Sequence, residues 1–245
     1  MFIKSKFANG INLEGWLMKK ITILIPVYNE LNTLDIIIKK VENASFGGLD
    51  KEIILIDDCS IDGTKELYAK YPYKVLYHKE NQGKGAAVRT GIKEATGDII
   101  VIQDADLEYN PDDYEPLIQA LLDDKADVCY GSRFMKESSS SSYMILNYLG
   151  NKFISAFTSL IFGRSLTDME TCYKAFKAEY IKNMDLKSNR FDFEPEVTAK
   201  LLKNKVRLLE IPISYNGRNF SEGKKITWRD GIHAMIALIK YKYTD

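Results

Sequence analysis

Four short apolar runs, separated by segments with a helical pattern, constrain most strongly how this chain can fold. They lie at residues 21–27, 52–56, 74–78 and 99–102. Strands that alternate with helices predict crossover connections and therefore an α/β fold, in which helices flank a mostly parallel sheet. Ligands of such sheets bind beyond the carboxyl ends of the strands, so we expect the polar turns after these runs to meet in one crevice.

The second half of the chain has a different pattern, which favours an α+β arrangement. A run of serines at 138–142 indicates a flexible loop. The last helix carries an apolar stripe formed by Ile232, Met235, Ile236 and Ile239. The elements expected here are strands at 127–130 and 206–211 and helices at 153–162, 194–202 and 226–243.

The composition narrows the possible functions. A chain of 245 residues is long enough for one large domain with a substantial core. Its formal net charge of +0 provides no global field that would attract nucleic acid. Two histidines and three widely spaced cysteines disfavour a zinc site or a histidine-based triad. No apolar run reaches the roughly 18 residues that a transmembrane helix needs.

The first 17 residues differ from the rest of the chain. They have neither the apolar centre of a signal peptide nor a clear strand or helix period. We therefore expect residues 1–17 to be a disordered or peripheral N-terminal extension, with the domain beginning near Met18. The alternative is an amphipathic surface segment that uses Phe2, Ile3, Phe7 and Trp16.

The apolar run at 99–102 is followed by three acidic side chains at alternating positions, Asp104, Asp106 and Glu108. Carboxylates crowded at a strand end repel one another unless a cation lies between them, and a hard divalent ion suits such oxygen ligands. An open site of this kind suits a metal that is shared with a phosphorylated substrate. The alternative is a solvated acidic turn.

Several polar segments occur in an order that resembles the family 2 glycosyltransferases, which have a GT-A fold. They lie at residues 26–30, 57–64, 103–106 and 131–133. Two further segments, 166–174 and 217–225, are similar to the dolichyl-phosphate mannose synthase-like branch, whose members glycosylate polyprenyl phosphates.

The resemblance covers about residues 19–230 and implies one GT-A domain at 18–245. Within this domain, residues 18–136 would form the nucleotide-sugar-binding half. Residues 137–245 would form the acceptor-binding half.

The resemblance implies a site for a nucleotide-diphosphate sugar. Pro26, Tyr28 and Glu30 would line the pocket for the base and ribose. The alternative for them is a plain strand end with a glutamate that favours the helix dipole. One of Asp57 and Asp58 would reach the nucleobase while the other stabilises the turn, unless both serve the turn.

The resemblance also implies that Mg²⁺ or Mn²⁺ bridges the donor diphosphate to Asp106, with help from Glu108. Asp104 would face the ribose or sugar with partial access to the metal, and Ala105 lies between the two aspartates in the donor site. Lys84 lies in a glycine-rich loop, where it either contacts the donor or starts a helix.

A phosphate acceptor needs positive charges that bind it more than it needs a general base. A phosphate monoester, with a second pKa near ~6, is already largely ionised at neutral pH. A sugar hydroxyl needs a general base instead. By resemblance Arg133 and Arg218 would bind the acceptor phosphate. Further candidates, for which an ordinary surface position is the alternative, are Lys152, Lys224 and Lys225.

Asp168 is the remaining candidate for catalysis. In relatives that use hydroxyl acceptors, an acid near this place acts as the base. Here Asp168 would do the same, or it would orient Arg218 or a lysine. The three predicted catalytic residues are therefore Asp106, Asp168 and Arg133.

These observations predict a metal-dependent inverting glycosyltransferase that moves a hexose from a GDP-mannose or UDP-glucose type of donor to dolichyl or undecaprenyl phosphate. It would work at the cytoplasmic face of the membrane, in peripheral contact through residues 153–162 or the basic and aromatic tip at 240–243. The alternative is that both helices simply pack on the sheet, which we favour for the last helix, with its basic end in water. One alternative is a GT-A transferase that acts on a sugar hydroxyl in surface polysaccharide synthesis. Another is a non-catalytic nucleotide-binding partner in a membrane assembly.

Overall fold

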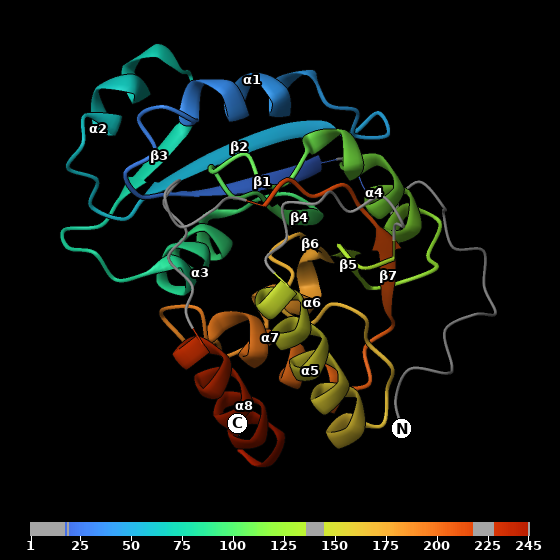
Figure 1. Cartoon of the computed structure of the whole chain (residues 1–245). Helices are drawn as coiled ribbons and strands as arrows, with labels where there is room; N and C mark the ends of the chain where they lie inside the picture. Colours follow the sequence, from blue (N-terminus) through green and yellow to red (C-terminus); the bar gives the residue numbers. More distant parts are fainter. Residues whose placement is uncertain (1–17, 19, 136–144, 218–227, 245) are drawn as a thin grey trace, which may run out of the picture.

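A seven-stranded sheet organises residues 18, 20–135, 145–217 and 228–244, which are the residues that the computed structural model describes. The strand order is β3-β2-β1-β4-β6-β5-β7, and only the two pairs that β6 makes with β4 and β5 are antiparallel. The expected α/β fold with a mostly parallel sheet is confirmed (Figure 1). The strands are β1 (Lys20–Val27), β2 (Asp50–Asp57), β3 (Lys74–Tyr77), β4 (Ile99–Ile102), β5 (Val128–Ser132), β6 (Lys174–Lys177) and β7 (Leu208–Pro212).

Helices cover both faces of this sheet. In Figure 1, α1 and α2 lie above the sheet, whereas α3, α5, α7 and α8 lie below it. The described helices are α1 (Leu34–Asn43), α2 (Thr64–Leu67), α3 (Lys84–Glu94), α4 (Tyr114–Leu122), α5 (Ile145–Phe162), α6 (Ala178–Lys182), α7 (Phe193–Lys203) and α8 (Trp228–Tyr243).

The side chains of β1 show how one strand serves two cores. Ile21, Ile23 and Ile25 point to the core that also contains α1 and α4. Leu24 points to the opposite core, beneath α3 and α7. Successive side chains of a strand face opposite ways, so a continuous apolar run is what a strand buried on both faces requires.

The second half contains a strand that the sequence pattern did not predict. In β6, two of the four residues are lysines, Lys174 and Lys177, and both are buried. Each lysine has an acidic partner: Lys174 pairs with Glu194, and Lys177 pairs with Asp124 and Asp127. Burial of a charge is tolerated when it is paired. Because the partners come from other elements, the strand is hidden from a reading of local hydrophobicity.

The apolar stripe of α8 has a different role from the buried face of the helix. Ala237, Leu238 and Tyr241 are buried against the rest of the protein. Ile236 and Ile239, on the stripe, remain exposed. None of the helices in the described ranges has both the length and the apolar character to cross a bilayer.

Candidate active site

The loops after β1 and β2 are tied together at the carboxyl ends of these strands. The backbone N–H of Asn29 donates to Ser60 Oγ at 3.0 Å, and the N–H of Ile61 donates to Asn29 Oδ1 at 2.8 Å. Asn29 and Cys59 both have positive φ angles, 57° and 66°, which turn the two loops sharply. The two polar turns therefore meet beside each other, as the strand pattern predicts.

The segment from Pro26 to Glu30 lies in this region. Pro26, Tyr28 and Glu30 are each partly exposed. A carboxylate oxygen of Glu30 accepts a hydrogen bond from Thr33 Oγ1 at 2.6 Å, just before α1. Its backbone N–H donates to Thr64 Oγ1 at 3.0 Å, which joins the starts of α1 and α2. Contact of these three residues with a nucleotide stays a prediction.

Asp58 is buried and receives hydrogen bonds from the segment that leads into α3. His78 Nδ1 lies 2.7 Å from Asp58 Oδ1, and Asn81 Nδ2 donates to Oδ2 at 2.8 Å. The backbone N–H groups of Gln82 and Gly83 donate at 2.9 and 2.8 Å. The Asp58 carboxylate thus holds the end of β2 to the start of α3.

Asp57 is also buried and also bonded within the protein. Its carboxylate accepts from Tyr68 Oη at 2.7 Å and from the backbone N–H of Ser60 at 3.1 Å. Burial and the Asp57 carboxylate together hold the pKa of Tyr68 well above its ordinary value. The turn role expected for one of the two aspartates is met by both, and contact with a nucleobase stays a prediction.

Lys84 is the first residue of α3, and its Nζ lies 2.5 Å from Asp104 Oδ1. Burial opposes the charged lysine, yet the negative charge of Asp104 holds the pKa of Lys84 well above its ordinary value. The helix start packs closely on a neighbouring loop, because a Cβ at Gly83 would lie 2.5 Å from the Asn189 carbonyl oxygen. The glycine positions Lys84 beside the acidic loop after β4.

That acidic loop is shaped by its own side chains. Gln103 is buried, accepts from Tyr114 Oη at 2.7 Å, and donates to the Asp104 carbonyl oxygen at 2.9 Å. Asp106 Oδ1 accepts the backbone N–H of Glu108 at 3.1 Å. Ala105, between the two aspartates, is buried in the core. These contacts fix the turn that carries the acids.

Two of the three acids after β4 have partners within the protein. Glu108 Oε2 accepts from Tyr215 Oη at 2.7 Å, while Asp104 faces Lys84. Within the described ranges, no three acidic, histidine or cysteine side chains form a metal-binding cluster. Binding of a metal ion by Asp104, Asp106 and Glu108 stays a prediction.

Arg133 and Asp168 form a buried ion pair. Their exposed fractions are 6% and 0%. Asp168 Oδ2 accepts the backbone N–H of Arg133 at 2.9 Å and Nε at 2.7 Å, and Oδ1 accepts Nη2 at 2.7 Å. Glu210 on β7 holds the Asp168 backbone N–H at 2.8 Å. Such a bidentate pair fixes the plane of the guanidinium. Asp168 therefore fixes the orientation of Arg133. Its two expected roles, as a base or as a group that orients Arg218 or a lysine, stay predictions.

Aromatic rings lie around this arginine. The guanidinium carbon lies 5.2 Å from the ring centroid of Tyr215 and 5.5 Å from that of Phe134. Lys152 on α5 brings its Nζ within 5.2 Å of the same Phe134 ring. Two of the predicted acceptor cations thus share one aromatic neighbour.

The other cations predicted for the acceptor phosphate cannot be placed. Arg218, Lys224 and Lys225 lie outside the described residues, as does the N-terminal extension at 1–17.

A second charged cluster lies near this pair, and sequence reasoning did not find it. Lys174 on β6 pairs with Glu194 at the start of α7, and its Nζ lies 4.6 Å from the ring centroid of Tyr130. Glu170 is close to both, and burial raises its pKa to about 8, although the charge of Lys174 opposes this shift. Glu170 and Lys174 lie in the segment 166–174 that carries the family resemblance, whereas Glu194 lies outside it.

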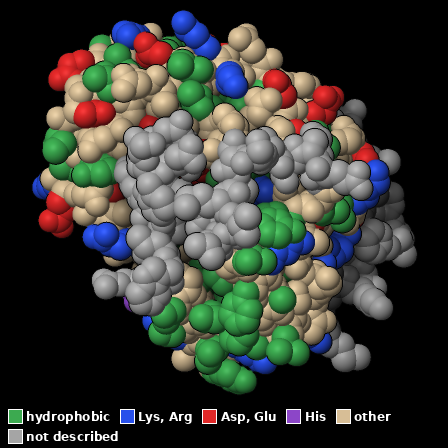
Figure 2. Space-filling view, in the orientation of Figure 1, with side chains coloured by type: hydrophobic (Ala, Val, Ile, Leu, Met, Phe, Trp, Pro, Cys, Tyr) green, Lys and Arg blue, Asp and Glu red, His purple; other side chains and the backbone are tan. Residues whose placement is uncertain are grey.

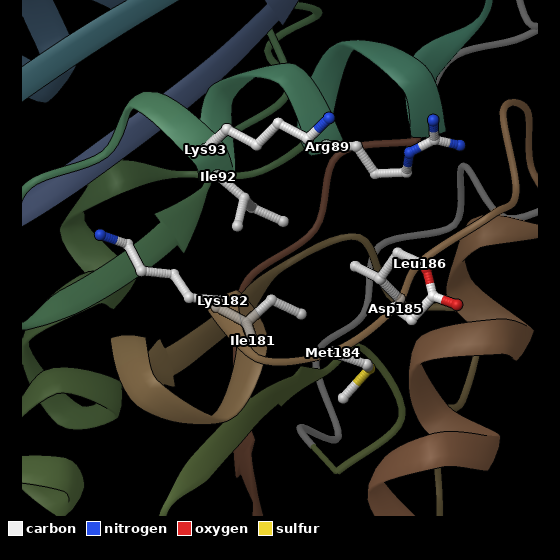
Figure 3. Close-up of a pocket in the computed structure, with 8 residues that line it drawn as sticks. All are labelled: Arg89, Ile92, Lys93, Ile181, Lys182, Met184, Asp185 and Leu186. Carbon is white, nitrogen blue, oxygen red and sulfur yellow. The ribbon is translucent and has the colours of Figure 1, made fainter. Parts of the chain in front are cut away.

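A hollow on the outer side of α3 is separate from these residues (Figure 3). It has a volume of about 160 Å³ and lies between α3 and the segment around α6. Arg89 at its rim donates to the Lys187 carbonyl oxygen at 2.6 Å, and Lys182 donates to the Ala95 carbonyl oxygen at 2.5 Å. Both cations are hydrogen-bonded to neighbouring backbone. We therefore interpret the hollow as a gap between packed elements and not as a ligand site.

A comparison with models of protein families identifies the family of the chain. The model described as "Glycosyl transferase family 2" matches residues 22–184. The chain belongs to glycosyl transferase family 2. It is thus a glycosyltransferase with the GT-A fold, as the order of its motifs predicted.

Curated members of family 2 show moderate identity to the chain. A dolichol-phosphate mannosyltransferase of Pyrococcus furiosus is 31% identical over 84% of this chain, and the match spans 59% of that longer protein. A UDP-N-acetylglucosamine–dolichyl-phosphate N-acetylglucosaminyltransferase of Methanococcus voltae is 28% identical, over 86% of this chain and 94% of the relative.

A solved structure supports the fold. Glucosyl-3-phosphoglycerate synthase from Mycobacterium tuberculosis, in complex with Mn²⁺, UDP and phosphoglyceric acid, superposes with a TM-score of 0.71. The superposition covers 93% of this chain and 80% of that one, at 15% identity. At this identity the likeness concerns the fold alone.

Proposed function

We propose that this family 2 enzyme transfers a hexose, with inversion, from a nucleotide-diphosphate sugar of the GDP-mannose or UDP-glucose type to a polyprenyl phosphate. One observation carries the proposal: the Asp168 carboxylate, where a hydroxyl-using enzyme would need a base, is occupied by Arg133. The names of the relatives agree, since they include transferases for dolichyl phosphate and undecaprenyl phosphate.

The acceptor chemistry follows from the charge of the phosphate. A phosphate monoester needs no general base, because its second pKa of ~6 leaves it ionised at neutral pH. It does need fixed donors, and guanidinium matches phosphate geometry well. We assign this contact to Arg133, with Lys152 nearby and Arg218 and Lys224 as further candidates.

The reaction is a single displacement at the anomeric carbon. An acceptor phosphate oxygen forms the new bond to this carbon while the bond to the nucleoside diphosphate breaks. No proton has to move, because both the nucleophile and the leaving group are anions. The role of the protein is to hold two anions on opposite sides of one sugar.

A divalent cation, Mg²⁺ or Mn²⁺, fits the donor side. Asp104 and Asp106 offer only carboxylate oxygens, and Asp106 is partly exposed at the carboxyl end of β4. Such ions are often held by one or two carboxylates plus substrate phosphate. When bound, the ion would neutralise charge on the leaving diphosphate. Lys84 would add a second positive charge there.

A lipid acceptor requires a surface that meets the bilayer. Figure 2 shows hydrophobic side chains gathered over α5 and α8, at the bottom of the view. We propose that this face touches the cytoplasmic surface of the membrane, with Lys240 near the headgroups. The two helices are joined, because Lys242 Nζ donates to the Ile161 carbonyl oxygen at 2.6 Å. The exposed residues of this face are Leu149, Phe153, Leu160, Ile232, Ile236, Ile239 and Tyr243.

The proposal is tested by following labelled sugar. The protein is incubated with Mn²⁺ and labelled GDP-mannose or UDP-glucose, together with vesicles that contain or lack undecaprenyl phosphate. We expect label in the organic phase only with the lipid phosphate, and its loss with chelator. Label that enters only a water-soluble glycan would favour a hydroxyl acceptor. Nucleotide-sugar binding without transfer to any acceptor would indicate a non-catalytic partner.

A further inference from the structure

Two buried carboxylate oxygens accept no hydrogen bond among the described residues. They are Oε1 of Glu170 and Oε1 of Glu194. A buried acceptor without a partner is destabilising, so it is rare in a native protein unless a ligand completes it. Both unpartnered oxygens of the described residues fall in the same cluster, beside Lys174.

A neighbour in the same helix shows that this lack is specific. Glu196 is two positions after Glu194 on α7 and is also buried. Its carboxylate accepts from Lys200 Nζ and from the backbone N–H groups of Lys187 and Ser188, at 2.7–2.9 Å. The fold is therefore able to satisfy a buried glutamate here, and it leaves Glu170 and Glu194 incomplete.

Several charged groups lie near Glu170 and Glu194. After burial, the groups that shift the pKa of Glu170 are Lys174, Glu194, Arg133 and Asp168. Glu194 in turn contributes to the shift in the pKa of Lys84, after burial and Asp104. Glu170 lies two positions after Asp168, and Glu194 follows Phe193, whose Cβ would lie 2.9 Å from a Cβ at Gly85, the residue after Lys84. The two glutamates are therefore near both the Arg133–Asp168 pair and the Lys84–Asp104 pair.

This is where the transferred sugar has to lie. Under the function proposed above, the donor diphosphate is held near Asp104 and the acceptor phosphate near Arg133. The anomeric carbon is bonded to the first and attacked by the second, so the sugar ring occupies the space between them. Hydroxyl groups of a sugar are suitable partners for unpaired carboxyl oxygens.

We propose that Glu170 and Glu194 bind hydroxyl groups of the transferred sugar through these oxygens and so determine which sugar is accepted. This inference rests on the proposed function. Glu194 also balances the charge of Lys174, with which it forms an ion pair, whereas Glu170 forms no ion pair among the described residues. Glu170 is therefore the cleaner residue for a test.

The charge of the cluster favours a neutral Glu170. Lys84, Arg133 and Lys174 face four acids, which are Asp104, Asp168, Glu170 and Glu194. A protonated Glu170 balances the three cations against three anions. A protonated carboxyl both donates and accepts, as a hydroxyl does, so the two groups are complementary.

The first test separates sugar recognition from nucleotide recognition. Affinities for UDP, GDP, UDP-glucose and GDP-mannose are measured by calorimetry with Mn²⁺. For Glu170→Met we expect the affinity for the nucleotide sugar that the wild type binds to fall about tenfold or more, and that for its nucleoside diphosphate to change less than about twofold. Glu170→Gln keeps a donor and an acceptor, so it should stay within about threefold of wild type for both ligands.

Glu196→Gln is the matched control, because it alters a buried glutamate of the same helix that already has its partners. It should lower thermal stability and leave the ratio of the two affinities unchanged. Equal loss of both ligands in Glu170→Met, or no loss of either, would overturn the inference.

A pH series provides a second readout if Glu170→Met does not fold. Wild-type affinity for the nucleotide sugar should fall as the pH rises through about 8, where Glu170 ionises. Affinity for the nucleoside diphosphate should not follow it, and Glu170→Gln should lack the fall. The same fall in Glu170→Gln, or none in wild type, would contradict the inference.

The two proposals fail in different ways. A wild type that binds nucleotide sugars but moves none to lipid phosphate overturns the proposed acceptor and leaves the role of Glu170 supported. Transfer to lipid phosphate that is indifferent to Glu170→Met overturns only the sugar-binding role.

Discussion

The loop after β2 and the cluster beside β6 both bury acidic side chains, but they treat them differently. Asp57 and Asp58 receive hydrogen bonds from neighbouring backbone and side chains. Glu170 and Glu194 each keep an oxygen that has no partner among the residues the structure describes. A carboxylate that the fold satisfies is part of the framework, whereas one that the fold leaves incomplete is available to a ligand. The difference separates the scaffold of this active site from the surface that meets the sugar.

In the Arg133–Asp168 pair, the buried carboxylate is satisfied by a residue that we also assign to the acceptor phosphate. Breaking this pair should therefore have the largest effect on stability and transfer. Arg133→Ala leaves Asp168 buried and unpaired, which should cost about 3–5 kcal/mol of stability in urea unfolding. Transfer to undecaprenyl phosphate should fall about 100-fold or more, because a fixed phosphate donor is lost.

The double variant Arg133→Ala, Asp168→Ala separates these two effects. Removing both charges should restore much of the stability and none of the transfer. Recovery of transfer in the double variant would show that Arg133 does not bind the acceptor.

Asp58→Asn should weaken the framework side of the comparison. An amide cannot accept all the hydrogen bonds that the carboxylate accepts, so we expect a loss of about 2 kcal/mol in thermal or urea unfolding. The folded variant should keep its affinity for nucleoside diphosphate within about threefold. A large loss of affinity at unchanged stability would instead support the predicted nucleobase contact by this pair of aspartates.

Glu170→Gln should change how stability depends on pH. Burial raises the pKa of folded Glu170 to about 8, while an unfolded glutamate ionises near ~4.3. Between these values the folded state binds the extra proton, so stability falls as pH rises, by up to ~1.4 kcal/mol per unit from this group. Glutamine removes this slope.

The stability of Glu170→Gln relative to wild type should therefore grow from pH 5 to pH 8 in urea unfolding. Hydrogen bonds outweigh burial at Glu196 and lower its pKa, so Glu196→Gln should show a deficit that is constant in this range. Parallel curves for wild type and Glu170→Gln would contradict the raised pKa.

Two exposed apolar residues provide a comparison on the surface, where we expect substitutions to change the stability of the fold least. Leu160 on α5 is 80% exposed, and Ile61 in the loop after β2 is 81% exposed. Leu160→Glu should weaken co-sedimentation with anionic vesicles, because it places a charge in the proposed membrane face. Ile61→Glu is the matched control and should bind as wild type does. Neither variant should unfold, and equal binding by both would exclude this face.

The sequence was sufficient for the elements whose stabilising groups are local. In α1, Leu34, Ile37, Ile38 and Val41 follow one another at helical spacing, and all four are buried. The missed strand β6 depends on acids from other elements, which neutralise Lys174 and Lys177. The stripe of α8 is visible in the sequence, but the sequence does not tell whether such a stripe is buried; in the structure Ile232, Ile236 and Ile239 are exposed.

For the active site, too, the sequence predicted some features and not others. The order of the motifs predicted the family and the role of the strand ends. It could not predict that Asp168, 35 residues after Arg133, would hold that arginine. Nor could it distinguish the satisfied Glu196 from the incomplete Glu194, because hydrogen-bond partners are set by the tertiary structure.

The central claim is that Asp168 positions Arg133 and does not act as a base. Steady-state transfer to undecaprenyl phosphate by Asp168→Asn tests this most directly. The amide still accepts one hydrogen bond from the guanidinium, so we expect the KM for the acceptor to rise about tenfold and kcat to stay within about threefold. A fall in kcat of about 100-fold or more with an unchanged KM would identify Asp168 as a general base and contradict the account.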